Sequence, residues 1–105
     1  MQRLIYGGLL LACLMVPAAA RSDDGAAIKI DNFTFSPAKL SVAKGTEVTW
    51  TNGDDIPHTI VMTGIGVRSK AIDTDKTFAY RFDKAGTFSY ICGLHPQMRG
   101  QVVVK

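Results

Sequence analysis

The sequence has little cysteine and little histidine, the residues that characterise disulfide-rich proteins and many metalloproteins. It holds only two cysteines and two histidines in 105 residues, which excludes both a disulfide framework and a histidine-rich cluster for several metal ions. Its 12 basic and 9 acidic residues are interspersed, so the net charge of +3 forms no basic block of the kind that binds nucleic acids. No repeat or low-complexity tract is present. These absences favour one small globular domain.

The first twenty residues have the pattern of an export signal. Arg3 gives a positive start, residues 4–16 are almost all apolar, and the Pro-Ala-Ala-Ala stretch at 17–20 is a small-residue cleavage site. The apolar run is shorter than the roughly 20 residues that a membrane-spanning helix needs. We therefore predict a secretory signal peptide at 1–20, removed from a periplasmic domain at 21–105.

The two cysteines fall in different parts of this scheme. Cys13 lies in the predicted signal, where Leu-Leu-Ala-Cys at 10–13 loosely matches a lipoprotein signal and offers lipidation as an alternative to simple cleavage. Cys92 is then the only cysteine of the exported domain. By itself it is equally explained as a buried small hydrophobic residue and as a reactive thiolate.

Alternating apolar residues between turn residues predict short strands rather than helices. The clearest alternations are Val48, Trp50 and Asn52; Phe78, Tyr80 and Phe82; and Phe88, Tyr90 and Cys92. Phe33 and Phe35 continue an earlier series, and residues 58–62 form a further expected strand. Seven or eight such strands without a convincing helix indicate an all-β fold, an antiparallel sandwich or Greek-key barrel.

A thiolate, an imidazole and a thioether recur at three-residue intervals in Cys92, His95 and Met98, directly after an expected strand. His58 begins another expected strand, and in a sandwich the start of one strand and the end of another share a rim. Two imidazoles and a thiolate with a weak axial thioether are the donor set of blue-copper electron-transfer sites. The loop has no carboxylate, which argues against Ca²⁺ or Mg²⁺.

Each donor also has an ordinary structural explanation. Met98 alone fits a core filler, and His95 beside Pro96 fits a loop histidine. Their joint placement with the only thiol of the predicted domain favours copper over these explanations. A zinc site accepts the thiolate and the imidazoles, but a thioether is a poor zinc ligand.

Several stretches resemble the cupredoxins, the small blue-copper proteins, and their amicyanin-like branch in particular. The matching segments are 48–52, Pro57-His58, 86–92 and 99–104. The loop with two residues between His95 and Met98 also resembles that branch. The resemblance implies a cupredoxin-like Greek-key β-sandwich around one type 1 copper ion.

The resemblance also implies roles for individual residues. His58, Cys92 and His95 would be equatorial ligands and Met98 the axial one. Asn52 would support the site by tying the two ligand loops together and stabilising the Cys92 sulfur. Gln97 departs from the branch, because an apolar residue there would extend the surface around His95.

The implied function is one-electron transfer by Cu(II)/Cu(I) cycling, without enzymatic activity. His95 would be the electron port, surrounded by an apolar rim that we define as Ile56, Pro57, Leu94 and Pro96. The expected partners of this monomer are transient redox proteins, such as a dehydrogenase and a c-type cytochrome, with no nucleic acid and no membrane span. A periplasmic copper-binding or delivery protein with the same ligands is the alternative. A multicopper enzyme would need more histidines than the chain has.

Overall fold

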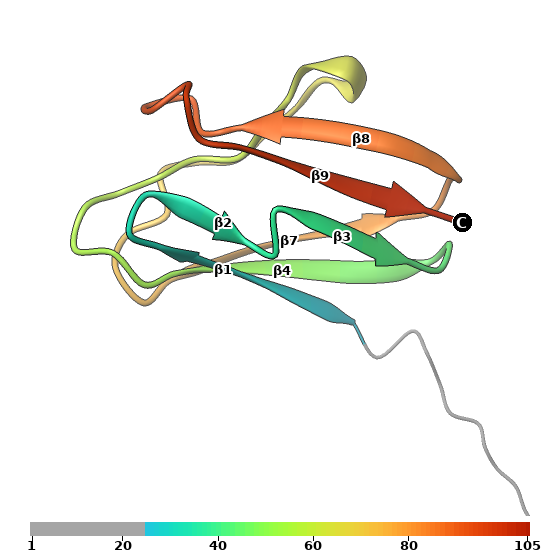
Figure 1. Ribbon diagram of the computed structural model, residues 1–105, viewed down its shortest axis with the longest axis horizontal. Helices are drawn as coiled ribbons and strands as arrows, with labels where there is room; N and C mark the ends of the chain where they lie inside the picture. Colours follow the sequence, from blue (N-terminus) through green and yellow to red (C-terminus); the bar gives the residue numbers. More distant parts are fainter. Residues whose placement is uncertain (1–24) are drawn as a thin grey trace, which may run out of the picture.

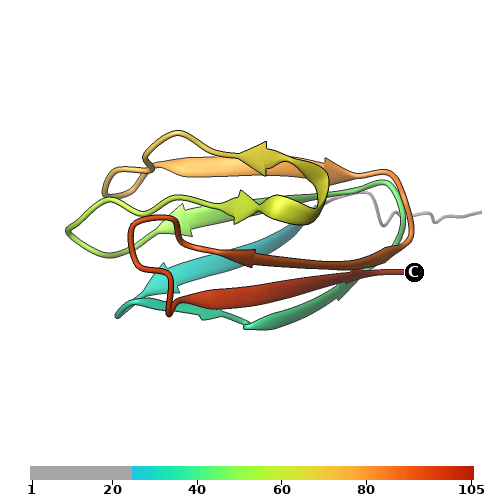
Figure 2. The same cartoon turned by 90° about the horizontal axis from the view of Figure 1, so that it is seen from above.

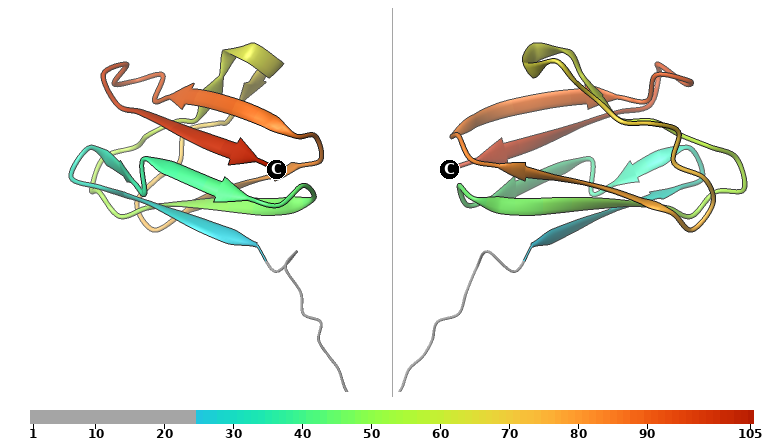
Figure 3. Two further views of the ribbon diagram at one scale, coloured as in Figure 1. Left: turned by 45° about the vertical axis from the view of Figure 1, so that its right-hand side comes forward. Right: turned by 180° about the vertical axis from the view of Figure 1, so that it is seen from behind.

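The computed structural model describes residues 25–105, which form two β-sheets packed face to face. One sheet has the order β2-β1-β4-β7 and the other β3-β9-β8-β5-β6. The strands are β1 (Ala26–Asp31), β2 (Thr34–Ser36), β3 (Lys39–Val42), β4 (Thr46–Asn52), β5 (Val61–Met62), β6 (Val67–Arg68), β7 (Thr77–Phe82), β8 (Gly86–Ile91) and β9 (Arg99–Val104). Figures 1 and 3 show β8 and β9 stacked over β1 and β4. The predicted signal at 1–20 and Cys13 lie outside the described residues.

The alternation along β4 shows how the sequence builds the sandwich. Thr46, Val48, Trp50 and Asn52 are buried, whereas Glu47 and its alternating neighbours face outward. Strand β4 pairs with β1 in parallel and with β7 antiparallel. It is therefore a central strand, and one of its faces lines the interior.

An aromatic layer fills the space between the sheets. Trp50 and Tyr90 meet edge to face with ring centroids 5.3 Å apart, and Phe35 contacts Tyr90 at 4.8 Å. All three side chains are at most 2% exposed. Because Trp50 and Phe35 come from one sheet and Tyr90 from the other, this layer fixes the spacing of the two sheets.

The loops that carry the predicted ligands gather at one end of the sandwich. Figure 2 shows the β8–β9 loop, the segment after β4 and the β1–β2 turn at the end opposite the C-terminus. Cys92 follows β8 directly, and His58 follows the loop after β4. The end of β8 and the segment that begins at His58 therefore lie at the same end of the sandwich, as the sequence predicted.

The all-β prediction is confirmed, but the strand boundaries differ from it. Residues 25–105 form nine strands, where seven or eight were expected. The expected strand at 58–62 is regular only at β5, and His58 makes an isolated bridge with Ile72. A short 3-10 helix, Thr63–Ile65, follows. Among residues 25–105 no helix is long and apolar enough to cross a membrane.

Candidate metal centre

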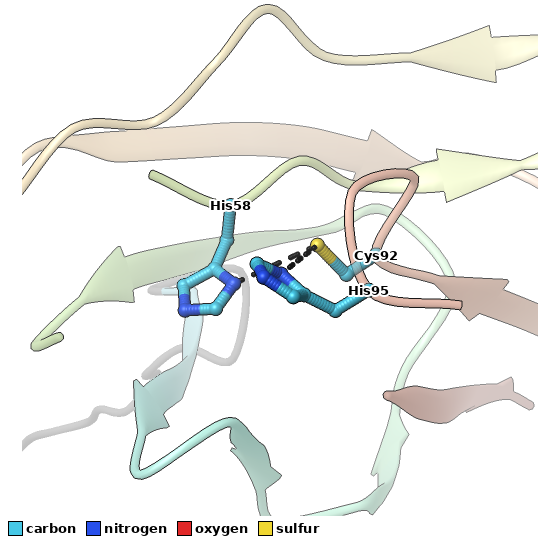
Figure 4. Close-up of side chains that lie close together, drawn as sticks. All are labelled: His58, Cys92 and His95. Carbon is cyan, nitrogen blue, oxygen red and sulfur yellow. Dashed lines mark hydrogen bonds between the residues drawn. The ribbon is translucent and has the colours of Figure 1, made fainter. Parts of the chain in front are cut away.

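Three side chains that are far apart in the sequence converge at this end of the sandwich. Cys92 Sγ lies 3.6 Å from His58 Nδ1 and 3.6 Å from His95 Nδ1. The three donor atoms all lie within 4.8 Å of one another. Figure 4 shows both rings directed toward the sulfur. The structure thus brings together the three residues that the sequence predicts as equatorial ligands.

These separations suit a single metal ion between the three donors. Bond lengths of about 2.0 Å to imidazole nitrogen and about 2.3 Å to thiolate sulfur, at angles of 109 to 120°, place nitrogen and sulfur about 3.5 to 3.7 Å apart. The observed 3.6 Å falls in this range. One soft thiolate and two imidazoles are a donor set that copper accepts in both of its oxidation states.

The orientation of His58 is set by a carboxylate. His58 Nε2 lies 2.8 Å from Asp54 Oδ2, and the His58 side chain is fully buried. Because Nε2 donates its proton to Asp54, the neutral ring presents an unprotonated Nδ1 to Cys92. This is the tautomer that a metal ligand needs.

Asp54 also accepts hydrogen bonds from the β1–β2 turn. The donors are the backbone N–H groups of Asn32 at 2.6 Å and Phe33 at 3.0 Å. Desolvation raises the pKa of Asp54, but the hydrogen bonds from Phe33, His58 and Asn32 outweigh it and hold that pKa below its usual value. The carboxylate therefore stays charged and joins the β1–β2 turn to His58. Sequence reasoning missed Asp54, although its position four residues before His58 was a signal.

Cys92 is fully buried and receives a backbone hydrogen bond. Thr59 N–H points at Cys92 Sγ, with 3.4 Å between nitrogen and sulfur. The hydroxyl of the same threonine accepts the Gly93 N–H at 2.8 Å. Thr59 therefore ties the His58 segment to the Cys92 loop, and its amide stabilises a thiolate.

Asn52 is buried, and its side chain makes three hydrogen bonds. Its Nδ2 donates to the carbonyl groups of Ile56 and Ile72, at 2.7 and 2.8 Å, and its Oδ1 accepts the Asp54 N–H at 2.8 Å. All three bonds stay on the His58 side, and Ile72 O also accepts the His58 N–H at 3.2 Å. The recorded side-chain hydrogen bonds of Asn52 join residues on the His58 side, whereas the contacts to the Cys92 sulfur and to Gly93 come from Thr59.

The loop from Cys92 to Met98 is closed by its own backbone. Cys92 N–H donates to Met98 O at 3.1 Å, His95 N–H to Cys92 O at 3.2 Å, and Met98 N–H to His95 O at 2.8 Å. Met98 is 3% exposed and belongs to the hydrophobic core. The three-residue spacing therefore gives a tight loop in which His95 remains half-buried at the surface.

The apolar rim lies around this loop. Leu94 is 52% exposed, Pro57 and Pro96 are exposed, and Ile56 is half-buried. Phe33, which the sequence analysis placed in one alternating series with Phe35, lies in the β1–β2 turn. It is 47% exposed and contacts the rings of both His58 and His95.

Comparison with known proteins agrees with this geometry. The family model described as "Cupredoxin-like domain" matches residues 4–104. The chain belongs to the cupredoxin family. Amicyanin-alpha of Methylorubrum extorquens is 34% identical over 96% of this chain and 85% of that protein. Amicyanin of Paracoccus versutus is 30% identical over 86% of this chain and 72% of that protein.

Solved structures place this cupredoxin in the same branch. The structure of the oxidised state of an amicyanin mutant superposes with a TM-score of 0.74 at 30% identity, covering 81% of this chain and 86% of that one. A reduced Cu(I) form of another amicyanin mutant, at pH 4, gives 0.73 at 29% identity with the same coverage. The predicted cupredoxin fold and the amicyanin-like branch are confirmed.

Proposed function

We propose that His58, Cys92 and His95, with Met98 as a weak fourth donor, hold one type 1 copper ion, and that the exported protein passes single electrons between protein partners in the periplasm. The observation that carries the proposal is a fully buried cysteine with two imidazole nitrogens at 3.6 Å from its sulfur. The chain is a blue-copper electron carrier rather than an enzyme, like its amicyanin homologues.

The bound copper supplies the Cu(II)/Cu(I) couple, and the chain supplies a fixed set of donors. His58 is locked by Asp54, Cys92 by the Thr59 amide, and the His95 loop by its own hydrogen bonds. Donors that are held in place before the electron arrives need little rearrangement when the charge of the site changes. This rigidity supports fast outer-sphere transfer.

Protein partners would meet the half-buried His95 and the apolar rim around it. A small apolar patch of this kind suits brief docking, for which interfaces are typically below about 1,200 Å².

The first experiment is addition of Cu(II) to the purified domain 21–105 with its thiol reduced. We expect an intense blue thiolate-to-copper band at one copper per chain, bleached by a mild reductant. Cys92→Ser should lack the band while keeping the fold, because the same loop stays closed by backbone hydrogen bonds. A wild-type protein with only the faint colour of loosely bound copper would contradict the ligand assignment.

A second pair of measurements distinguishes an electron carrier from a copper-delivery protein. The carrier should lose copper slowly to a chelator and exchange electrons quickly between its own Cu(I) and Cu(II) forms, measured by NMR line broadening. Leu94→Glu should slow this self-exchange without changing the blue band, since Leu94 is a surface residue of the apolar rim. Fast copper loss with slow exchange would favour delivery.

Export is tested on the full chain. The predicted signal at 1–20 should be removed, so that the protein recovered from the periplasmic fraction begins at Arg21. A mature protein that begins with a lipid-modified Cys13 and stays with the membrane would overturn this part of the proposal.

A further inference from the structure

Phe33 occupies a backbone position that does not suit a bulky residue. Asp31 pairs with Thr34 across the β1–β2 hairpin, so Asn32 and Phe33 form a two-residue loop. Their φ angles are 53° and 58°, both in the left-handed region, as in a type I′ turn. The second position of this turn is normally glycine, and a phenylalanine there is strained.

The strain is offset by a carboxylate that also holds a predicted ligand. Asp54 Oδ1 accepts the Asn32 N–H, and Asp54 Oδ2 accepts both the Phe33 N–H and the His58 Nε2 proton, at 2.6, 3.0 and 2.8 Å. The Asp54 side chain is only 11% exposed. The turn and the His58 ring are therefore fixed to the same largely covered carboxylate.

The ring of Phe33 packs on the two predicted imidazole ligands. Its centroid lies 5.7 Å from that of His58 and 5.3 Å from that of His95, with interplanar angles of 90° and 82°. Phe33 is neither a member of the hydrophobic core cluster nor among the half-buried residues packed against it. The recorded ring contacts of Phe33 are with the two predicted imidazole ligands.

His95 needs such a contact more than His58 does. His58 is fully buried and bonded to Asp54, whereas the His95 ring is half-buried and its recorded neighbours are the Cys92 sulfur, the His58 ring at 5.1 Å and the Phe33 ring. An aromatic ring packed edge to face is a directional contact. It restricts rotation of the half-buried His95 ring.

We propose that Phe33 is a positioning residue of the metal centre, kept in a strained turn so that its ring holds the imidazoles of His58 and His95 toward Cys92. The inference rests on the proposed function, because it takes those three residues as the ligands. It predicts that removing the Phe33 ring makes the His95 imidazole more mobile and copper binding weaker. The same change removes the backbone strain of the turn, so the apoprotein should not become less stable. Residues that stabilise a fold behave in the opposite way, which makes the proposal testable.

The experiment compares three variants with the wild type. Phe33→Gly and Phe33→Asn remove the ring and suit the left-handed backbone, whereas Phe33→Tyr keeps the ring and the strain. We measure the melting temperature of each apoprotein, the order of the His95 ring in the apoprotein by NMR relaxation, and the rate of copper loss from the reduced protein to bicinchoninate.

For Phe33→Gly and Phe33→Asn we expect an unchanged or higher apoprotein melting temperature, a more mobile His95 ring and copper loss faster by about tenfold, the size of effect seen for residues that orient metal ligands. Phe33→Tyr should match the wild type in ring order and copper loss. Equal copper loss and ring order in all four proteins would overturn the proposal. So would a fall in apoprotein stability in the Gly and Asn variants, because Phe33 would then be a structural residue.

The outcomes separate this proposal from the proposed function. A wild-type protein without a blue band would contradict the ligand assignment, whatever the variants do. A normal wild-type band with unaltered variants would contradict only the role of Phe33. If Phe33 instead serves solely to contact a partner, self-exchange would slow in the Gly and Asn variants while copper loss and His95 order stay unchanged, which also overturns the proposal.

Discussion

His58 and His95 present the same nitrogen to Cys92 at the same distance of 3.6 Å, but different regions of the molecule hold them there. His58 is fully buried beside β5, bonded to the Asp54 carboxylate and bridged through its backbone to Ile72. His95 is half-buried in a loop held by three backbone hydrogen bonds and by contact with Phe33.

Because their burial and hydrogen bonds differ, His58 and His95 serve different functions although both are histidines. A buried ligand with a charged partner keeps its geometry and excludes water, but it offers no contact to another protein. A ligand in a short surface loop allows close approach of a redox partner, and its order then depends on packing.

Replacing either histidine by glycine should abolish the blue band, but only one loss should be reversible. Added imidazole is expected to restore the band in His95→Gly, because the vacated position opens at the surface. In His58→Gly the vacated position is enclosed and should remain empty at the same imidazole concentration. Absorption spectra recorded during an imidazole titration check this. Equal restoration in both variants would contradict the comparison.

Asp54→Ala should weaken the His58 region and leave the His95 loop folded. The variant loses one ligand-orienting bond and two backbone anchors, so copper affinity should fall by about 10- to 100-fold. The apoprotein should lose about 2 kcal/mol of stability, the scale of hydrogen bonds to a charged group. Competition with a copper chelator and thermal melts measure the two effects.

The matched control for that experiment is Asp55→Ala, which removes the exposed neighbouring carboxylate. It should behave as the wild type in both measurements. If Asp55→Ala matched Asp54→Ala, the effect would come from the general negative charge of this loop and not from the Asp54 contacts.

Thr59→Val should give a smaller effect, at the junction of the two regions. It removes the hydroxyl that accepts the Gly93 N–H but keeps the backbone amide that faces Cys92 Sγ. We expect a loss of about 1 kcal/mol in apoprotein stability and a small change in the blue band. Thr59→Ser keeps the hydroxyl and should resemble the wild type in denaturant melts, so equal losses in the two variants would exclude the hydrogen bond as the cause.

Tyr90→Phe should leave the metal centre unchanged and alter only the response of the fold to alkali. Burial raises the pKa of Tyr90 to about 12, and the nearby Trp50 N–H opposes this rise only in part. The native state holds the phenol proton more tightly than the unfolded chain. Its stabilising contribution, at most about 3 kcal/mol, is therefore complete below pH 10 and is lost as the pH rises toward 12.

Denaturant melts of the apoprotein between pH 8 and 12 measure this effect. The alkaline loss should disappear in Tyr90→Phe and persist in Tyr80→Phe, which retains Tyr90. Near neutral pH Tyr90→Phe should be neutral or slightly stabilising, because the buried Tyr90 hydroxyl lacks a hydrogen-bond partner of good geometry. A changed blue band in Tyr90→Phe would show that the geometry of the ligands depends on the aromatic core as well as on the surroundings of His58 and His95.

Sequence patterns predicted the regular part of the fold well. Alternation placed Val48, Trp50 and Asn52 on the interior face of β4, and it placed Tyr90 and Cys92 on one face at the end of β8. The alternation did not predict the length of a strand whose pairing partners are far away in the sequence. The expected strand at 58–62 is regular only over Val61–Met62, because its pairing depends on β6 and β8.

The donor atoms of the centre were predictable, but their supports were not. Thiol, imidazole and thioether are rare in this chain, and their chemistry is specific, so composition and spacing identified them. Asp54 and Thr59 are common residue types whose hydrogen bonds join segments 21 to 34 residues apart. The signal peptide, the cleavage site and the status of Cys13 remain predictions.

The sequence by itself determined a β-sandwich and the donors for a soft metal ion, because both follow from local alternation and from side-chain chemistry. Only the tertiary structure decided which carboxylate fixes His58, which residue bonds to the Cys92 sulfur, and that Phe33 contacts both imidazoles edge to face. These features depend on contacts between the β1–β2 turn, the segment after β4 and the Cys92–Met98 loop. Their proximity arises only when the two sheets pack.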